Sequence, residues 1–284
     1  MKQAGGIQRL LVHTALILIC GSAAVPFFWM LSTSFKTLDR AMSFPPQLIP
    51  SPFVPENYTN IIANPHSKFL LWTRNTLVIA VLGVLGTTLS SALVAYGFAK
   101  LRFIGRGPLF VLMLSTMMLP FPVTMVSLFT LFRWLGDTTG VAWLGTFKPL
   151  WVPAWFGSAF NIFLLRQFFM TIPTELEDAA RIDGASSFQI LRQIVIPLSM
   201  PALATVAIFS FIYHWNDFLH PLLYLSSKEM KTLALGLALF KGEYSNDWNL
   251  MMAASVMALL PCLTIFFLAQ RYFIEGITMT GLKQ

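Results

Sequence analysis

The feature that most constrains this chain is a series of long segments without a single lysine, arginine, aspartate or glutamate. A helix needs about 20 mostly apolar residues to cross the hydrocarbon core of a bilayer. Segments near or above that length are 10–35, 75–99, 107–132, 149–165, 193–216 and 248–270. Because 56% of the residues are hydrophobic and only 11% are charged, a water-soluble domain is excluded. The sequence therefore predicts an all-α polytopic integral membrane protein with six transmembrane helices.

Basic residues near helix ends indicate which side of the membrane a loop occupies, because cytoplasmic loops are enriched in them. The tightest basic cluster, Lys100, Arg102 and Arg106, lies between the second and third predicted helices. With six spans, this favours cytoplasmic termini. The expected division is a cytoplasmic N-terminus (1–9), a first transmembrane helix (10–33), an extracytoplasmic loop (34–74), a domain with the other five helices (75–273) and a cytoplasmic tail (274–284).

The segments around the first helix carry two further signals. Its apolar stretch continues well past a possible signal-peptide cleavage site at 21–24, so we expect a retained membrane anchor. In the loop 34–74, prolines at positions 45, 46, 50, 52, 55 and 65 exclude a long helix. The loop is either a contact surface for a partner at the outer face or a simple connector.

The second and third predicted helices carry packing signals. Small residues recur every four positions at Gly83, Thr87, Ser91 and Ala95, which lets another helix approach closely in lipid, within this chain or from a partner. Two prolines, at 120 and 122, interrupt the third helix and remove backbone donors. Such a break either lines a pathway or is a packing kink.

The segment 171–197, called the elbow below, is predicted to form two short helices joined by a turn. Thr174 and Glu177 have the spacing of a capping box at the start of the first helix. Gly184 is placed to end that helix in the left-handed conformation that glycine adopts without penalty.

Ser186 and Gln189 repeat the capping box for the second helix of the elbow. We expect this helix to end just before Pro197, because proline disfavours the helical conformation in the residue preceding it. The elbow also carries four acidic residues, so a protein surface is a better partner for it than anionic lipid. These are Glu175, Glu177, Asp178 and Asp183.

The sequence of the elbow is similar to a known signature. The run Asp178-Ala179-Ala180-x-x-Asp183-Gly184-Ala185, followed by Ile194-Val195-Ile196-Pro197-Leu198, resembles the "EAA" signature of ABC importer permeases. The blocks 163–169 (Phe-Leu-Leu-Arg-Gln-Phe-Phe) and 215–222 (Trp-Asn-Asp-Phe-Leu-x-Pro-Leu) resemble the carbohydrate-uptake branch, of maltose and glycerol-phosphate type. The chain departs from the signature in its leading residue, which is Asp178 instead of glutamate.

This resemblance implies a type I ABC importer permease fold in the bacterial cytoplasmic (inner) membrane, with the elbow as the coupling helix that docks on an ATPase subunit. The implied partners are an ABC ATPase dimer, a second related permease, an extracytoplasmic solute-binding protein and a sugar-like solute. The solute itself is left open among oligosaccharides, monosaccharides, polyols and glycerol phosphate. The residues implied for ATPase coupling are Glu175, Asp178, Ala179, Ala180, Asp183, Gly184, Ala185 and Phe188.

A stripe of polar residues follows the fifth predicted helix. The stripe includes the carboxylate of Asp217. Placing an ionisable side chain within a membrane span costs free energy, so such a residue is a functional candidate. The stripe either hydrogen-bonds a solute or packs against the second permease. Its members at three- and four-residue spacing are Ser210, Tyr213, His214, Asp217, His220 and Tyr224. The candidate residues for a substrate pathway are Tyr213, His214, Asn216, Asp217 and Tyr224.

Several activities are excluded. No Gly-Lys dipeptide occurs, so the chain lacks a P-loop and a partner must hydrolyse ATP. No catalytic, metal or cofactor site is predicted, and Cys20 and Cys262 are expected to act as small apolar residues. Basic residues are scattered rather than gathered into patches, which argues against nucleic acid. The rival interpretation is an ion-gradient-driven secondary transporter that uses Asp217 as a proton relay.

Overall fold

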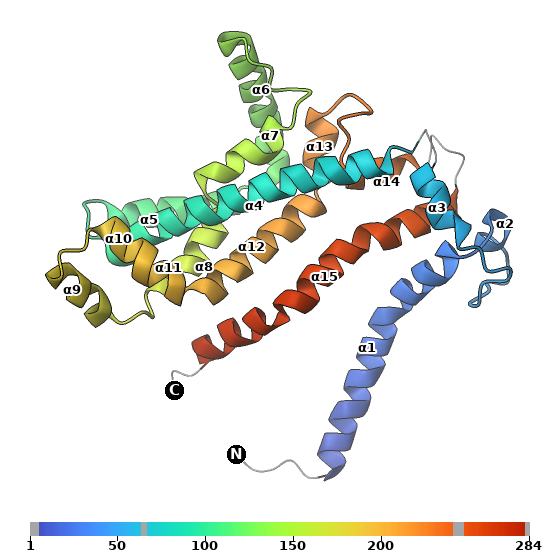
Figure 1. The fold of residues 1–284 in the computed structure, drawn as a ribbon, viewed down its shortest axis with the longest axis horizontal. Coiled ribbons are helices and arrows are strands. Elements are labelled where there is room, and N and C mark those ends of the chain that lie inside the picture. Colours follow the sequence, from blue (N-terminus) through green and yellow to red (C-terminus); the bar gives the residue numbers. More distant parts are fainter. Residues whose placement is uncertain (1–5, 64–66, 241–246, 282–284) are drawn as a thin grey trace. The chain divides into compact units, whose positions relative to one another are not determined.

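The computed structural model describes residues 6–63, 67–240 and 247–281, and over these residues the backbone is helical or irregular, without a strand (Figure 1). The all-helical class predicted from the sequence is therefore confirmed. The chain divides into two compact units. The smaller comprises Met1–Phe69 and Gly236–Leu260, and the larger comprises Leu70–Leu235 and Pro261–Gln284. Of the predicted cytoplasmic termini, residues 1–5 and 282–284 lie outside the described part of the chain.

The smaller unit contains α1 (Gly6–Ser34), α2 (Leu38–Ala41), α3 (Glu56–Ala63) and the first half of α15 (Trp248–Gly281). The proline-rich loop forms no long helix between α2 and α3, as its composition predicts. It is tied back to the end of α1, because Val54 N–H donates to the carbonyl of Phe35 at 2.8 Å.

Buried polar residues hold the smaller unit together. The side-chain nitrogen of Asn57 donates to the carbonyl oxygens of Ser34 and Lys36, both at 2.9 Å, at the end of α1 where helical carbonyls lack partners. Asn249 of α15 donates to Asn57 Oδ1 at 3.2 Å. The Lys36 ammonium lies 4.6 Å from the centre of the Trp29 ring, and burial lowers the pKa of this lysine.

The larger unit begins with α4 (Phe69–Lys100), which runs without a break and starts inside the predicted extracytoplasmic loop. The elements that follow are α5 (Arg106–Ser115), η1 (Thr116–Met118), α6 (Phe121–Thr139), α7 (Lys148–Trp151), η2 (Val152–Phe156), α8 (Ala159–Phe169), α9 (Thr174–Ile182), α10 (Ser187–Ile190), the π-helical η3 (Leu191–Val195), α11 (Ile196–Leu198), α12 (Met200–Trp215) and α13 (Leu219–Tyr224). The residues of α14 (Leu233–Leu239) are divided between the two units. Figure 1 shows α9 and α10 at one end of α4, with α12 running beside it.

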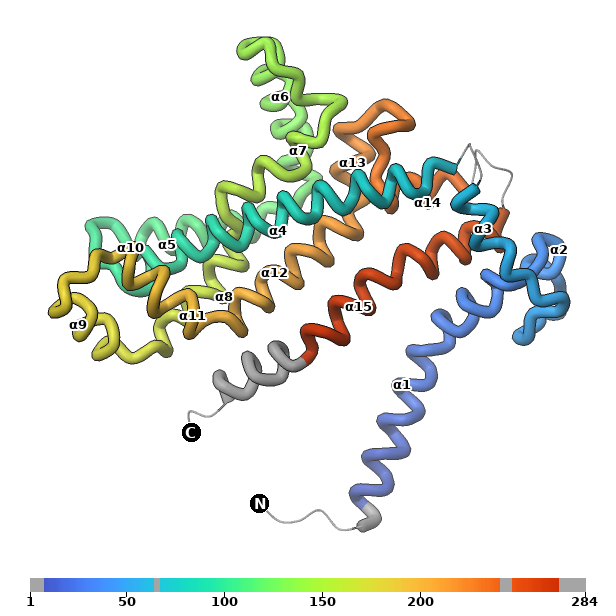
Figure 2. The backbone as a smooth tube through the Cα atoms, in the orientation of Figure 1, coloured from blue at the N-terminus to red at the C-terminus, as the bar shows by residue number. Residues whose placement is uncertain are grey.

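The third predicted span is bent. The pair Arg106–Met118 and Phe121–Thr139 meets at 101°, and Figure 2 shows α6 turning away from the direction of α5. Leu119 and Pro120 between them are both extended. For Leu119 the reason is that the residue before a proline avoids the helical conformation.

Three helices are long and apolar enough to cross a membrane among the described residues: Gln8–Ser34, Phe69–Lys100 and Trp248–Gln270. The number rises to five if each of two bent pairs counts as one span; the second pair is Ser187–Leu198 with Met200–Trp215. The predicted span at 149–165 consists of α7, η2 and part of α8, all shorter than 18 residues. The count of six spans therefore stays a prediction.

The core of the larger unit lies where α4, α8 and α12 meet the elbow. Fully buried side chains from each contribute, among them Ala95, Leu165, Val195 and Val206. The small residues of the ladder on α4 pack against other parts of this chain, since Thr87, Ser91 and Ala95 are buried. Of the two interpretations of this ladder, the structure supports packing within the chain.

Replacing Asn57 by alanine leaves the carbonyls of Ser34 and Lys36 without their donor. We expect a loss of about 2 kcal/mol in the stability of the smaller unit, from two hydrogen bonds of about 1 kcal/mol each. Thermal unfolding of the detergent-solubilised protein measures it. The matched control is Asn60→Ala, because Asn60 is exposed on the same helix. Equal melting temperatures for the two variants would contradict the capping role of Asn57.

Candidate functional site

The first helix of the elbow, α9, starts differently from the prediction. Its N-cap is Pro173, which has no side-chain acceptor, and Thr174 makes no capping hydrogen bond. The predicted Thr174–Glu177 capping box is therefore wrong. The reason is that Glu177 turns inward: its side chain is 2% exposed and pairs with Lys100 of α4.

The turn that ends α9 has the predicted geometry. Gly184 has a φ of +84°, in the left-handed region. The N–H of Ala185 donates to the carbonyl of Ala180 at 2.9 Å, and the N–H of Gly184 donates to the carbonyl of Arg181 at 3.0 Å. These two bonds form a Schellman motif, which satisfies the last carbonyls of the helix. The direction in which the chain leaves α9 is thereby fixed.

The second helix begins with the predicted capping box. Ser186 N–H donates to Gln189 Oε1 at 2.7 Å, and Gln189 N–H donates to Ser186 Oγ at 3.3 Å. The expectation that this helix ends before Pro197 is wrong, because the chain continues through η3 and α11 to Leu198. Pro197 lies within the helical stretch Ser187–Leu198, directly after the π-helical η3.

The residues predicted to contact an ATPase fall into two groups. Ala180 and Ala185 are half-buried and pack against the core of the larger unit. The exposed group comprises Glu175, Asp178, Ala179, Asp183, Gly184 and Phe188. Three large apolar side chains of the elbow are also exposed to solvent, namely Leu176 (45%), Ile182 (87%) and Phe188 (64%). The outer surface of the elbow therefore combines apolar and acidic groups.

A buried ion pair, not foreseen from the sequence, joins the elbow to α4. Lys100 Nζ lies 2.6 Å from Glu177 Oε1, and the two side chains are 5% and 2% exposed. Lys100 also donates to the carbonyl of Ile172 at 2.9 Å, and Arg181 approaches the other carboxylate oxygen of Glu177 at 3.6 Å. Charges almost never lie fully buried unless they are paired, which explains why the two occur together here.

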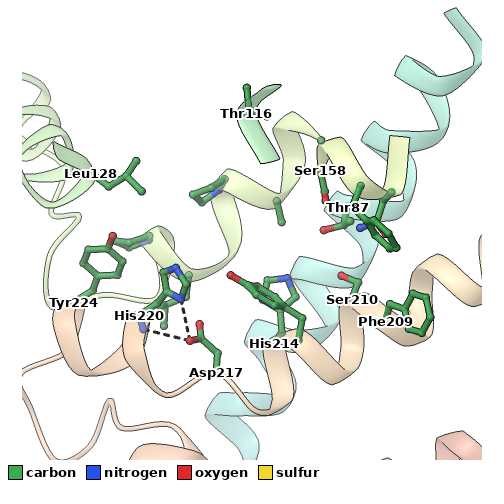
Figure 3. Close-up of a pocket in the computed structure, with 18 of the residues that line it drawn as sticks. Thr87, Thr116, Leu128, Ser158, Phe209, Ser210, His214, Asp217, His220 and Tyr224 are labelled. Carbon is green, nitrogen blue, oxygen red and sulfur yellow. Dashed lines mark hydrogen bonds and ion pairs between the residues drawn. The ribbon is translucent and has the colours of Figure 1, made fainter. Parts of the chain in front are cut away.

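A cavity of about 690 Å³ lies inside the larger unit. Of the five residues predicted for a substrate pathway, Tyr213, His214, Asp217 and Tyr224 line it. Asn216 does not; its side-chain nitrogen donates back to the carbonyl of Ile212 at 2.9 Å. The remaining walls come from α4, α6, α7, η2 and α8, which the polar stripe did not reveal. Figure 3 shows Tyr224 and Leu128 at one end and Thr87 and Ser210 at the other.

Asp217 is held within the cavity wall. Its Oδ1 accepts a hydrogen bond from the backbone N–H of His220 at 3.2 Å and lies 2.9 Å from His220 Nδ1, as the dashed lines in Figure 3 show. The carboxylate thus satisfies a backbone donor in the first turn of α13. The His220 ring in turn lies 4.0 Å, centre to centre, from the Phe121 ring at the start of α6. Asp217 and His220 therefore tie α13 to the bend of the third predicted span.

His214 depends on a glycine in α4. A Cβ atom at Gly83 would lie 2.3 Å from His214 Nε2, closer than any real contact. Glycine at this position of the ladder is therefore required so that the imidazole can lie between α12 and α4. Thr87, one turn further along α4, is a lining residue of the cavity.

The cavity combines flat apolar faces with polar atoms. Phe132, Phe160 and Phe209 line it together with the two tyrosines. Three polar atoms of lining residues, Asn161 Oδ1, Ser210 Oγ and Tyr224 Oη, are buried and find no hydrogen-bond partner among the described residues. Because these three atoms are shielded from the cavity as well as from bulk solvent, they do not contact a molecule inside it in this arrangement.

Comparison with known proteins places the chain in a family. The profile of the family described as "Binding-protein-dependent transport system inner membrane component" matches residues 88–278. The arabinooligosaccharides transport system permease protein AraQ of Bacillus subtilis is 36% identical over 80% of this chain and 78% of its own length. The trehalose/maltose transport system permease protein MalG of Thermococcus litoralis is 33% identical over 98% of each chain.

Two further similarities extend over nearly the whole chain. The sn-glycerol-3-phosphate transport system permease protein UgpE of Brucella abortus is 31% identical over 96% of this chain and 97% of its own. A chain in the crystal structure of a bacterial ABC transporter involved in import of the acidic polysaccharide alginate has the same fold, with a TM-score of 0.80 and 24% identity over 96% of this chain and all of that one. The chain therefore belongs to the family of binding-protein-dependent transport system inner membrane components, the ABC importer permeases that the elbow's signature predicted.

Proposed function

We propose that this chain is the permease subunit of an ATP-driven importer that moves a sugar or sugar-like solute into the cytoplasm by alternating access. The observation that carries the proposal is the family match over residues 88–278, which contain the elbow and helices α12 and α13. Its relatives AraQ and MalG are named as permeases for sugar oligomers and disaccharides. The chain itself is not an enzyme, and a partner subunit supplies ATP hydrolysis.

The elbow is the docking element for that ATPase subunit in this proposal. Leu176, Ile182 and Phe188 expose large apolar side chains next to acidic ones, and a protein partner would remove them from water. The Schellman turn at Gly184 and the capping box at Ser186 hold the two helices in one mutual orientation. A rigid, exposed element of this kind is suited to transmitting movement from a partner.

The cavity is the place proposed for the solute. Tyrosine and phenylalanine rings offer flat faces to a sugar ring, and hydroxyl and amide groups offer hydrogen bonds. Lining residues with side chains that are not fully buried, such as Thr116 and Ser158, are candidates for contacts with solute hydroxyls. Binding pockets of this kind are largely apolar, with a few polar groups that fix orientation.

The proposed assembly follows from membership in the family. It comprises an ATPase dimer, a second related permease and an extracytoplasmic solute-binding protein, in the cytoplasmic (inner) membrane with both termini of this chain inside. One structural neighbour is an alginate ABC transporter in complex with a pentasaccharide-bound periplasmic protein, with a TM-score of 0.66. That neighbour supports a binding-protein partner here. Closure of the ATPase dimer would move the elbows and turn the cavity from the inside to the outside.

The rival function, a secondary transporter with Asp217 as proton relay, is not favoured. Asp217 Oδ1 accepts a hydrogen bond from the backbone N–H of His220 and lies 2.9 Å from His220 Nδ1, so this oxygen anchors the start of α13. A secondary carrier also has no need of an exposed, acidic helical element with apolar side chains on its surface.

The direct test is a pull-down of this chain from its native membrane in mild detergent, followed by mass spectrometry. We expect an ATPase subunit and a solute-binding protein to accompany it. In Ile182→Asp the ATPase subunit is expected to be lost, because a charge replaces an apolar contact on the elbow. The matched control is Ile49→Asp, since Ile49 is equally exposed (81%) but lies in the predicted extracytoplasmic loop. Recovery of the chain alone would contradict the proposal.

Gly184 provides a prediction about the shape of the elbow. In the part of the chain that the structure describes, no atom lies within 4 Å of a Cβ built there, so a substitution causes backbone strain without a steric clash. The left-handed conformation costs about 1–2 kcal/mol for a residue with a side chain. We expect Gly184→Val to insert normally while uptake is lost, and Gly184→Asn to keep most of the uptake because asparagine tolerates this conformation. Normal uptake by the valine variant would contradict the proposal that transport depends on the shape of the elbow.

Tyr213 provides a prediction about the cavity. Tyr213→Ala removes an aromatic face from its wall, and an aromatic contact contributes about 0.5–1.5 kcal/mol. We expect solute uptake to fall by about twofold to tenfold at saturating binding protein, with the ATPase subunit still bound. Tyr213→Phe keeps the ring and is expected to retain most uptake. Phe267→Ala, at an exposed position of α15, serves as the control; if it and Tyr213→Ala behave alike, the solute does not pass Tyr213.

A further inference from the structure

The buried ion pair between Lys100 and Glu177 joins two elements that perform different tasks in the proposed function. Lys100 is the last residue of α4, and Glu177 lies in the middle of α9. Their charged atoms are 2.6 Å apart and both side chains are almost completely buried. Glu177 therefore cannot be part of the outer surface of the elbow that the acidic neighbours Glu175 and Asp178 occupy.

Further contacts restrict the position of this pair. The Lys100 ammonium also donates to the carbonyl of Ile172 at 2.9 Å, so it holds the chain just before α9 as well as α9 itself. Arg181, one turn after Glu177, approaches the second carboxylate oxygen at 3.6 Å and Asp178 at 2.9 Å. A lysine at the C-terminal end of a helix is also favoured by the helix dipole. The end of α4 and the first helix of the elbow are thus joined at several points.

The other end of the connection reaches the cavity. From Lys100, α4 continues without a break to Thr87 in the cavity wall and to Gly83, which packs on His214. A helix rises about 1.5 Å per residue, so Lys100 and Gly83 are about 25 Å apart along one rigid rod. A displacement of α9 that pulls on Lys100 would therefore move one wall of the cavity.

We propose that the Lys100–Glu177 ion pair is the connection through which movement of the elbow reaches α4 and the cavity. Both are positioning residues: they touch neither the solute nor the ATPase, and they act by holding α4 to α9. The inference rests on the proposed function, because it requires an ATPase that moves the elbow. It predicts a loss of coupling, meaning less solute taken up for each ATP hydrolysed, without a loss of the ATPase subunit.

The test compares three variants in proteoliposomes that contain the complete complex. Glu177→Gln leaves Lys100 buried without its counter-charge. Lys100→Met with Glu177→Leu replaces both charges by apolar groups, which buried ion pairs often tolerate without loss of stability. It nevertheless removes the directional contacts of Lys100 with Glu177 and with the carbonyl of Ile172. Asp137→Asn is the control, because it removes the acid of an exposed pair with Arg133 in α6, 3.9 Å apart. The measured quantities are the ATPase subunit retained, the rate of ATP hydrolysis and the uptake per ATP.

We expect uptake per ATP to fall at least tenfold in Glu177→Gln and in the double variant, and to stay at the wild-type value in Asp137→Asn. If Glu177→Gln fails to assemble, the double variant decides, because it contains no unpaired charge. A double variant that assembles and keeps the wild-type uptake per ATP would overturn the inference, and so would one that cannot assemble, since the pair would then serve folding alone. Wild-type uptake that needs no ATP would instead refute the proposed function.

Discussion

The unbroken helix α4 is the element on which the rest of the larger unit depends. Its small residues Ser91 and Ala95 are buried against neighbouring helices, its glycine at 83 makes room for His214, and its last residue, Lys100, pairs with the elbow. A kink in this helix would separate the cavity from the elbow. In lipid, close packing replaces the hydrophobic effect as the force that holds helices together, so a ladder of small residues is well suited to a central helix.

Local patterns predicted the end of the first elbow helix and the start of the second, because the groups involved are near in sequence. The left-handed Gly184 and the Ser186–Gln189 capping box need only their neighbours. The sequence could not reveal the partner of Glu177, which lies 77 residues earlier in the chain, at Lys100. A T-x-x-E spacing looks the same whether the glutamate caps its own helix or pairs with another one, and tertiary burial decided between the two.

The sequence predicted the residues that line only one wall of the cavity. Helical spacing grouped Tyr213, His214, Asp217 and Tyr224, and these line it, but they lie on α12, on the turn after it and on α13 instead of on one continuous helix. The opposite wall, with Phe132, Phe160 and Asn161, comes from helices whose apolar composition says nothing about where they meet. Composition also located the apolar segments, but it did not predict how their helices bend or break. Pro120 indicates a break, whereas the 101° bend and the short helices within 149–165 depend on contacts with other parts of the chain.

The dependence of solute uptake on ATP distinguishes most directly between an ATP-driven importer and an ion-gradient-driven secondary carrier. The chain would be reconstituted in proteoliposomes with the subunits that co-purify with it, and labelled oligosaccharide delivered by the binding protein would be counted inside. An ATP-driven importer takes up solute only when ATP is present on the side of the elbow, and this uptake is expected to stay unchanged when ionophores collapse the proton and sodium gradients. Uptake that needs no ATP and stops with the ionophores would contradict this expectation and would establish a secondary carrier.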